Sequence, residues 1–324
     1  MSRQIEMISL EDLVSPTHQY RKFKGSFNFK KIEPLLKSAE KDAHYKGYGV
    51  LRLFKGLLLQ FMEDLSDREL QRFLQENTAA KWFCEFGLTE KTPDYSVFSR
   101  LRGRIGTSRL SKMFAILRDQ LRQEGYISDV FTFVDASHLI AKASLWEERD
   151  KAIKKKYDKL NNETLAKVAK DTDARIGCKG KDKFWYGYKK HVGVDMSSGL
   201  IKKVAVTPAN VTDAQGFERV CPKSGAIYAD KAYCTRPAQQ TARRNNVHLA
   251  AIKKNNMKNK NKDLDRWITG IRSPYERVFA HQTHRVRYKG LVKNQFAEIM
   301  KALCFNLKRL VTLEPPPCES ALTG

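Results

Sequence analysis

Three acidic residues stand where their carboxylates could hold divalent metal ions. Asp135 ends the apolar run 131–134, and Asp230 ends a second apolar run, 226–229. Glu276 lies in a segment that reads as the opening of a helix. Mg²⁺ prefers oxygen ligands, and two such ions about 4 Å apart stabilise both the attacking and the leaving oxygen of a phosphodiester displacement. The three acids therefore predict a metal site for phosphoryl transfer.

A plainer interpretation competes for each acid taken alone. The chain holds 36 Asp and Glu residues, and an acid at a strand end is commonly a turn or cap residue. The order of the three, strand then strand then helix, favours the metal site. A cluster of acids is also an unusual feature in a chain whose formal net charge is +24.

The overall charge predicts a polyanionic partner. Lys and Arg number 60 against 36 acids, and the pI is near 9.8. Nucleic acid is the first candidate and an anionic membrane surface the second. No apolar run approaches roughly 18 residues, and the N-terminus lacks a signal-peptide core. The six cysteines contain no C-x-x-C pair, which argues against zinc and suits reduced thiols. We therefore expect a soluble, cytoplasmic protein.

The first part of the chain has a helical pattern. Apolar residues recur every three or four positions between residues 51 and 65, which indicates one face of a helix. Residues 66–69 form a capping-box pattern. A further helix is expected from Asp94, with Arg100 and Arg104 four apart on one face. We predict a helical DNA-binding domain over residues 1–125, whose last helix enters DNA. A solvated basic face on an ordinary helical bundle is the alternative.

After Gly125 the pattern becomes strand-like. Strands are expected at 131–135, 184–194, 200–206, 227–230 and 247–252, and helices at 212–220, 237–245 and from 276 onwards. The charged, apolar-poor stretch 144–183 is expected to be an insertion, and 313–324 a disordered tail. This order of elements is that of the ribonuclease H-like fold, an α/β fold. We expect a mixed five-stranded sheet with flanking helices over residues 126–312.

The chain resembles bacterial insertion-sequence transposases of the DDE type, specifically the IS5 family. Eight segments carry the resemblance, in the family's order: residues 65–70, 87–94, 134–137, 171–175, 186–191, 207–213, 229–233 and 272–276. The wider family often has Tyr-x2-Arg-x3-Glu-x6-Lys around the last acid. Arg272 and Glu276 fit that pattern, but Thr269 and Thr283 occupy its outer places. The candidates to supply the missing positive charge are Arg285, Arg287 and Lys289.

The resemblance implies an enzyme that cuts DNA at transposon ends and joins the 3′-OH to target DNA. Two Mg²⁺ ions, for which Mn²⁺ can substitute, would be held with Asp135 bridging both, Asp230 completing one site and Glu276 the other. Double-stranded DNA is the expected partner, and pairing of two DNA ends favours a homodimer.

DNA contacts are expected both near the acids and in the helical domain. The predicted DNA-binding residues are Arg272, Lys231, Tyr233, His191, Lys253, Lys254, Arg100 and Arg104. For His191, a packed or solvated histidine is the alternative. Two other functions compete with transposition: a ribonuclease H-like nuclease acting by hydrolysis only, and a catalytically inactive DNA-binding regulator. The helical module argues against the nuclease and the complete set of acids against the regulator.

Overall fold

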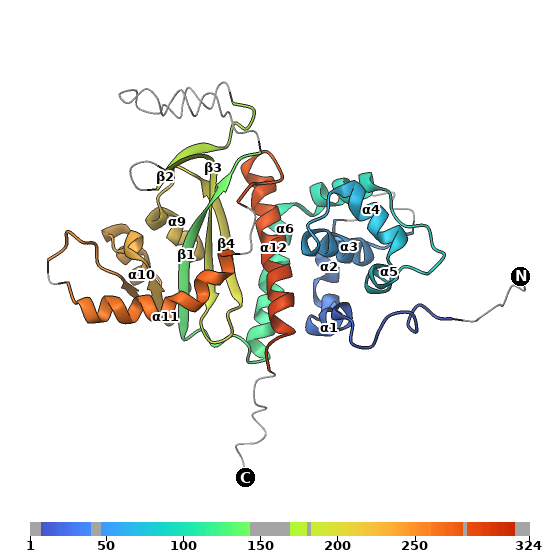
Figure 1. Cartoon of the computed structure of the whole chain (residues 1–324), viewed down its shortest axis with the longest axis horizontal. Helices are drawn as coiled ribbons and strands as arrows, with labels where there is room; N and C mark the ends of the chain where they lie inside the picture. The colour runs from blue at the N-terminus through green and yellow to red at the C-terminus, as the bar shows by residue number, and fades with distance from the viewer. Residues whose placement is uncertain are drawn as a thin grey trace, which may run out of the picture. The chain divides into compact units, whose positions relative to one another are not determined.

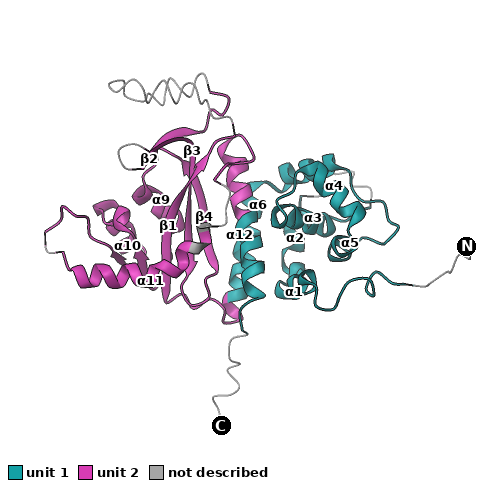
Figure 2. Ribbon diagram, viewed as in Figure 1, with its two compact units in different colours: residues 1–121, 300–324 teal, residues 122–299 magenta. Residues whose placement is uncertain are grey.

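The computed structural model describes residues 8–39, 47–142, 169–179, 183–258, 260–280 and 284–314. The chain divides into two compact units, Met1–Leu121 with Met300–Gly324, and Arg122–Ile299 (Figure 2). The predicted boundary between residues 125 and 126 stays a prediction. The compact units divide the chain slightly earlier and group 300–312 with the helical unit. Residues 315–324 of the predicted tail and 144–168 of the predicted insertion lie outside the described residues.

The first unit is helical (Figure 1). Its helices before the domain boundary are α1 (Gln19–Ser26), α2 (Glu33–Lys37), α3 (Val50–Met62), α4 (Asp67–Glu76), α5 (Thr78–Cys84) and α6 (Tyr95–Gln123), with a 3₁₀ turn η1 (Phe29–Ile32). Helix α3 is apolar around most of its circumference, and Leu53 and Leu57 are fully buried. The predicted capping box at the start of α4 is confirmed. The Ser66 side chain accepts from the Glu69 amide at 3.3 Å, and the Glu69 carboxylate accepts from the Ser66 amide at 2.7 Å.

Helix α6 begins where the sequence predicts a helix. The Asp94 carboxylate accepts a hydrogen bond from the Ser96 amide at 2.9 Å, which satisfies a donor that the first turn leaves free. Gly106 interrupts α6 with φ 62° and ψ 169°. Glycine adopts this conformation readily because it has no Cβ. The helix is therefore two segments joined by a kink.

The second unit is built on one mixed sheet. Its strands are β1 (Phe131–Ile140), β2 (Arg175–Lys179), β3 (Lys183–Asp195), β4 (Ile201–Pro208), β5 (Ala226–Ala229) and β6 (His248–Ala251). The order is β2-β3-β1-β5-β6, and β4 also pairs with β3. Strand β3 is antiparallel to β1, β2 and β4, whereas β5 is parallel to β1 and to β6.

The sheet has six strands rather than the predicted five, because β2 lies within the stretch taken as an insertion. The short charged sequence of β2 does not show the apolar pattern of a strand. Contacts with β3 hold it in the sheet instead. Gly177 of β2 lies opposite Trp185 of β3, where a Cβ would come within 2.5 Å of the indole ring. Just before β2, the Asp171 carboxylate accepts a hydrogen bond from the Tyr188 hydroxyl at 2.7 Å.

Helices flank this sheet (Figure 1). They are α9 (Asp213–Val220), α10 (Arg236–Arg244), α11 (Lys262–Ala280) and α12 (Leu291–Leu310). Phe217 of α9 packs in one buried cluster with Val134 of β1 and Ile227 of β5. The cluster includes Val134 and Ala229, the residues that directly precede Asp135 and Asp230.

Helix α11 corrects one prediction. The segment around Glu276 was expected to open a helix, but α11 starts at Lys262, and Pro274 lies inside it. The true start is marked by Asn261, whose side chain accepts from the amides of residues 263 and 264 at 3.0 Å each. Pro274 therefore lies inside the helix rather than in its first turn, the position that proline favours.

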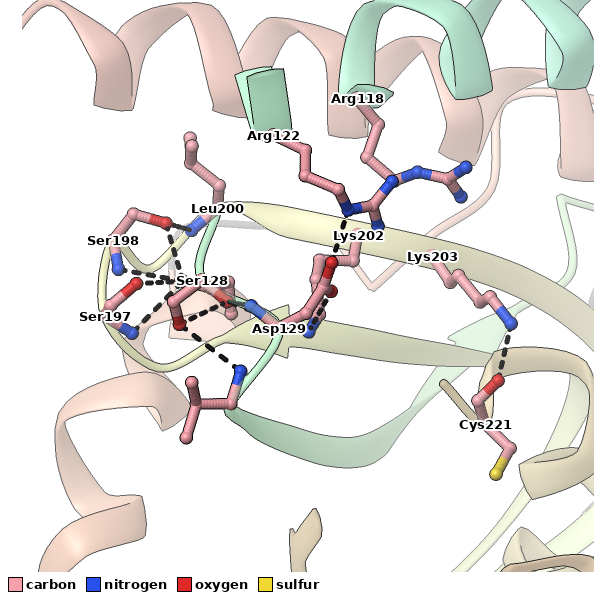
Figure 3. A network of polar contacts seen from close by, with 12 residues as sticks. Arg118, Arg122, Ser128, Asp129, Ser197, Ser198, Leu200, Lys202, Lys203 and Cys221 are labelled. Atoms are coloured by element: carbon pink, nitrogen blue, oxygen red, sulfur yellow. Dashed lines mark hydrogen bonds and ion pairs between the residues drawn. The ribbon is translucent and has the colours of Figure 1, made fainter. Parts of the chain in front are cut away.

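The start of β1 is fixed by a polar network (Figure 3). The Asp195 carboxylate accepts from the amides of Ser197 and Ser198 at 3.2 and 3.1 Å in the turn between β3 and β4. Asp129, just before β1, is paired with Arg122 and with Lys202, the latter at 3.0 Å. The network joins the entry to β1 to the β3–β4 hairpin, which holds β1 in register for the residues that follow.

Candidate active site

Two of the predicted acids lie where two parallel strands part. Strands β1 and β5 pair from Phe131 with Ala226 to Val134 with Ala229. Asp135 and Asp230 are the next residues on each strand, so their side chains emerge at the same end of this pair. Asp135 was predicted to end its strand, but β1 continues to Ile140 while only its pairing with β5 stops.

Local hydrogen bonds hold both aspartates. The Asp135 carboxylate accepts from the Ala136 amide, and the Asp230 carboxylate accepts from the Ala232 amide, each at 2.8 Å. Asp230 thereby caps the 3₁₀ turn η2 (Lys231–Tyr233). Each carboxylate keeps oxygen lone pairs that these single bonds do not use.

Helix α11 brings the third acid to the same place. Arg272 and Glu276 are one turn apart, with 3.7 Å between Nη2 and Oε1. The same Nη2 lies 3.9 Å from Oδ2 of Asp135. The Arg272 guanidinium is buried and lies over the Phe133 ring, 5.4 Å from its centroid. Tyr275 anchors this part of α11 by donating a hydrogen bond to the carbonyl of Met196.

The three acids open onto one cavity of about 780 Å³. Three of the predicted DNA-binding residues, Arg272, Lys231 and Lys254, also line it. The remaining lining residues are Ala136, Ser137, His138, Cys178, Lys179, Trp185, Lys189, Asp213, Ala232 and His284. None of these ten was predicted as a site residue. They come from segments far apart in the sequence, so only the fold could reveal their common location.

The electrostatics of Asp135 reflect its crowded surroundings. Burial, above all, raises the pKa of Asp135 to about 7. The negative charges of Asp230 and Glu276 raise it further, while the Ala136 amide and Arg272 oppose the shift. A raised pKa caused partly by neighbouring acids means that the cluster lacks compensating positive charge. Arg272 supplies some of that charge.

A bound divalent cation would supply the positive charge that the cluster of acids lacks. The donor set consists of three carboxylates, which are the oxygen ligands that hard cations prefer. In the described part of the chain, no three His, Cys, Asp or Glu side chains are grouped closely enough to hold one ion. The chemistry of the donors therefore fits a divalent cation, while the side chains would have to close in around it.

Two predicted DNA-binding residues are buried. His191 is fully buried, and its Nε2 lies 2.9 Å from the Thr207 hydroxyl. Burial lowers the pKa of His191 to about 4, so the ring stays neutral. Tyr233 is also fully buried, and its hydroxyl has no hydrogen-bond partner among the described residues. A DNA contact by either residue stays a prediction, and the burial of His191 is what the alternative of a packed histidine predicts.

The other predicted DNA-binding residues are not among those that line the cavity. Lys253 is half-buried, and its amide donates to the Asp265 carboxylate at 3.1 Å. Arg100 and Arg104 belong to the helical unit, where Arg100 is exposed and donates to the Ser96 hydroxyl at 3.3 Å. A DNA contact by any of these three stays a prediction.

Comparisons with known proteins agree with this site. The family described as transposase domain (DUF772) matches residues 8–104, and the family described as transposase DDE domain matches residues 132–307, which include all three acids. A solved structure titled "Mos1 transposase paired-end complex with left transposon end" is similar at 8% identity and a TM-score of 0.18, over 80% of this chain and 77% of that one. At that score the likeness carries no argument. None of the helices described in this chain is both long and apolar enough to cross a membrane.

The family match decides the identity of the chain. Transposases with this domain use divalent metal ions. A helical N-terminal region followed by a mixed sheet with flanking helices is the ribonuclease H-like arrangement of such enzymes, which confirms the predicted fold class. Because the match covers more than half of the 324 residues, the chain belongs to the transposase DDE domain family and is a DNA transposase.

Proposed function

We propose that this transposase is encoded by an insertion sequence of the IS5 type, and that it cuts DNA at the element's ends and joins the freed 3′-OH to target DNA. The observation that carries this proposal is the convergence of Asp135, Asp230 and Glu276, from β1, β5 and α11, on one cavity that cationic side chains also line. Double-stranded DNA is the substrate. Joining two ends to one target requires two active sites, which supports a homodimer.

The three carboxylates would hold two Mg²⁺ ions, with Mn²⁺ as a substitute. When bound, such ions neutralise charge on the phosphate and make water a stronger nucleophile. The chain's own contribution is to place the oxygen ligands. Asp135 and Asp230 are held by backbone amides at the end of the β1–β5 pair, and Glu276 is carried by a helix anchored through Tyr275.

The cationic side chains of the cavity would bind the DNA backbone. Lys231 is exposed and directly follows Asp230, and Lys254 lines the cavity from the segment after β6. Phosphate contacts of this kind fix the position of a strand without reading its sequence. Arg272 is buried and close to two acids, so its guanidinium holds the carboxylates together and can reach a phosphate only at the cavity floor.

A nuclease that acts by hydrolysis alone would use the same cavity, so the test must separate cutting from joining. Duplexes carrying the inverted repeats that flank the gene are incubated with the full chain, Mg²⁺ and a target plasmid. We expect cleavage at the repeat ends and covalent joining of those ends to the plasmid. Cleavage with no joined product would contradict transposition and favour the hydrolytic nuclease.

A further inference from the structure

One wall of the cavity carries a row of aromatic rings that the proposed chemistry does not use. His138 and His284 are stacked, with 4.2 Å between ring centroids and 10° between planes. His138 also packs against Trp185, with 5.6 Å between centroids. All three residues line the cavity that holds the acids.

The exposure of the rings increases along the row from Trp185 through His138 to His284. Trp185 is buried, and its indole N–H donates to the Tyr188 carbonyl at 3.1 Å. His138 is half-buried and His284 is exposed. One face of the His284 ring is covered by His138, so the opposite face is the one that remains to receive a ligand.

The backbone under His284 is fixed to the sheet. The Ile140 amide donates to the His284 carbonyl at 2.6 Å, and the Val286 amide donates to the Ile140 carbonyl at 2.9 Å. These bonds make a short parallel bridge between Ile140 and Arg285 at the end of β1. A ring held on such a backbone, with a second ring behind it, is already ordered for stacking and loses little conformational freedom when a ligand binds.

The ligand chemistry follows from the flat rings and their basic neighbour Lys179. Burial, together with the nearby His284 and Lys179, lowers the pKa of His138, which favours a neutral ring. Aromatic side chains, histidine included, bind nucleobases by stacking once a base has left the duplex. The exposed Lys179 in the same wall suits the phosphate of that nucleotide.

We propose that the outer face of His284, backed by His138 and Trp185, is a stacking site for an unpaired nucleobase beside the phosphate that the acids hold. The inference rests on the proposed function, because it needs DNA in this cavity. His138 follows Asp135 by three residues on β1, about 10 Å of strand. The base therefore belongs to one of the first few nucleotides next to the cut.

The test is a double-mutant cycle that combines protein variants with DNA lacking one base. The full chain and its His284→Phe and His284→Gln variants are titrated, without divalent ions, with the inverted-repeat duplex. The same duplex is also used with a single abasic site at each of the three nucleotides on either side of the cut. Phenylalanine keeps a flat ring but no polar atoms, and glutamine keeps polar atoms but no ring. The cost of unpairing is common to all three proteins and cancels in the comparison.

At one position, the affinity ratio of intact to abasic DNA is expected to be on the order of tenfold higher for wild type and His284→Phe than for His284→Gln. The exposed His248, which is outside the cavity lining, gives the control variant His248→Gln, and its ratio should match wild type. Equal ratios in all proteins at every position would overturn the stacking site, as would a ratio that glutamine preserves and phenylalanine loses. Failure of the wild-type chain to bind either DNA would instead sink the proposed function.

Discussion

Charged residues pointed to two places in the molecule, the cavity lined by the three acids and the basic face of α6. The evidence for a function differs between them. In the cavity, Asp135, Asp230 and Glu276 come from three elements and meet only because the sheet and α11 bring them together. On α6, Arg100 and Arg104 share a face because any two residues four apart on a helix do so. The convergence of residues distant in sequence is therefore evidence for a chemical role. Two residues four apart on one helix share a face in any helix, so their spacing alone says nothing about function.

The surroundings of the three acids also differ from those of the arginines on α6. Asp135 and Asp230 accept hydrogen bonds from backbone amides. Burial raises the pKa of Asp135, and the charges of Asp230 and Glu276 raise it further. Arg100 is exposed and donates a hydrogen bond to Ser96 one turn away. Strongly shifted pKa values concentrate at functional sites, so the raised pKa of Asp135 supports the proposed role of the acids.

The largest expected effect is on the cavity. Asp135→Asn, Asp230→Asn and Glu276→Gln should each reduce cleavage by at least about a hundredfold, because each removes one charge from the metal ligands at little change in volume. DNA binding should survive. Asp263→Asn is the matched control, since Asp263 lies on α11 with a side chain 91% exposed, and it should cleave like wild type. Near wild-type cleavage by any of the three would remove that residue from the site.

An intermediate effect is expected on the α6 face. If Arg100 and Arg104 contact base edges, then Arg100→Ala and Arg104→Ala should each weaken binding to the inverted repeat about tenfold, and binding to random DNA much less. Competitive titration with both DNAs measures the difference. Equal losses of affinity for the two DNAs would show that the arginines contact only phosphates. No loss for either DNA would show that this face is exposed to solvent and does not contact DNA.

The smallest expected effect concerns Lys231. Lys231→Gln should weaken binding to all DNA sequences alike and reduce the slope of log affinity against log salt by about one. Lys223→Gln provides a control, because Lys223 is also exposed and does not line the cavity. An unchanged slope for Lys231→Gln, measured between about 50 and 200 mM salt, would mean that this lysine does not contact phosphate.

Local signals in the sequence predicted a large part of the fold. The capping box at Ser66 and the helix start at Asp94 depend on neighbouring residues and are confirmed. The helix expected from the apolar residues between 51 and 65 is observed as α3 (Val50–Met62). These features need no knowledge of distant segments, which is why pattern alone was sufficient.

Features that depend on distant contacts were missed. Strand β2 is held by pairing with β3 and by Asp171, neither of which a charged five-residue pattern reveals. The segment around Glu276 was expected to open a helix, whereas α11 already begins at Lys262. Burial of His191 and the stacking of His284 on His138 follow from strand neighbours far apart in sequence.

The central claim is that the three carboxylates act together as one divalent-metal site. The most direct measurement is a Mn²⁺ titration of the full chain without DNA, followed by calorimetry or by the Mn²⁺ electron paramagnetic resonance signal. Wild type and Asp263→Asn should bind Mn²⁺ alike, and Asp135→Asn, Asp230→Asn and Glu276→Gln should each weaken that binding severalfold or more. Equal Mn²⁺ binding by wild type and by all three variants would contradict the account.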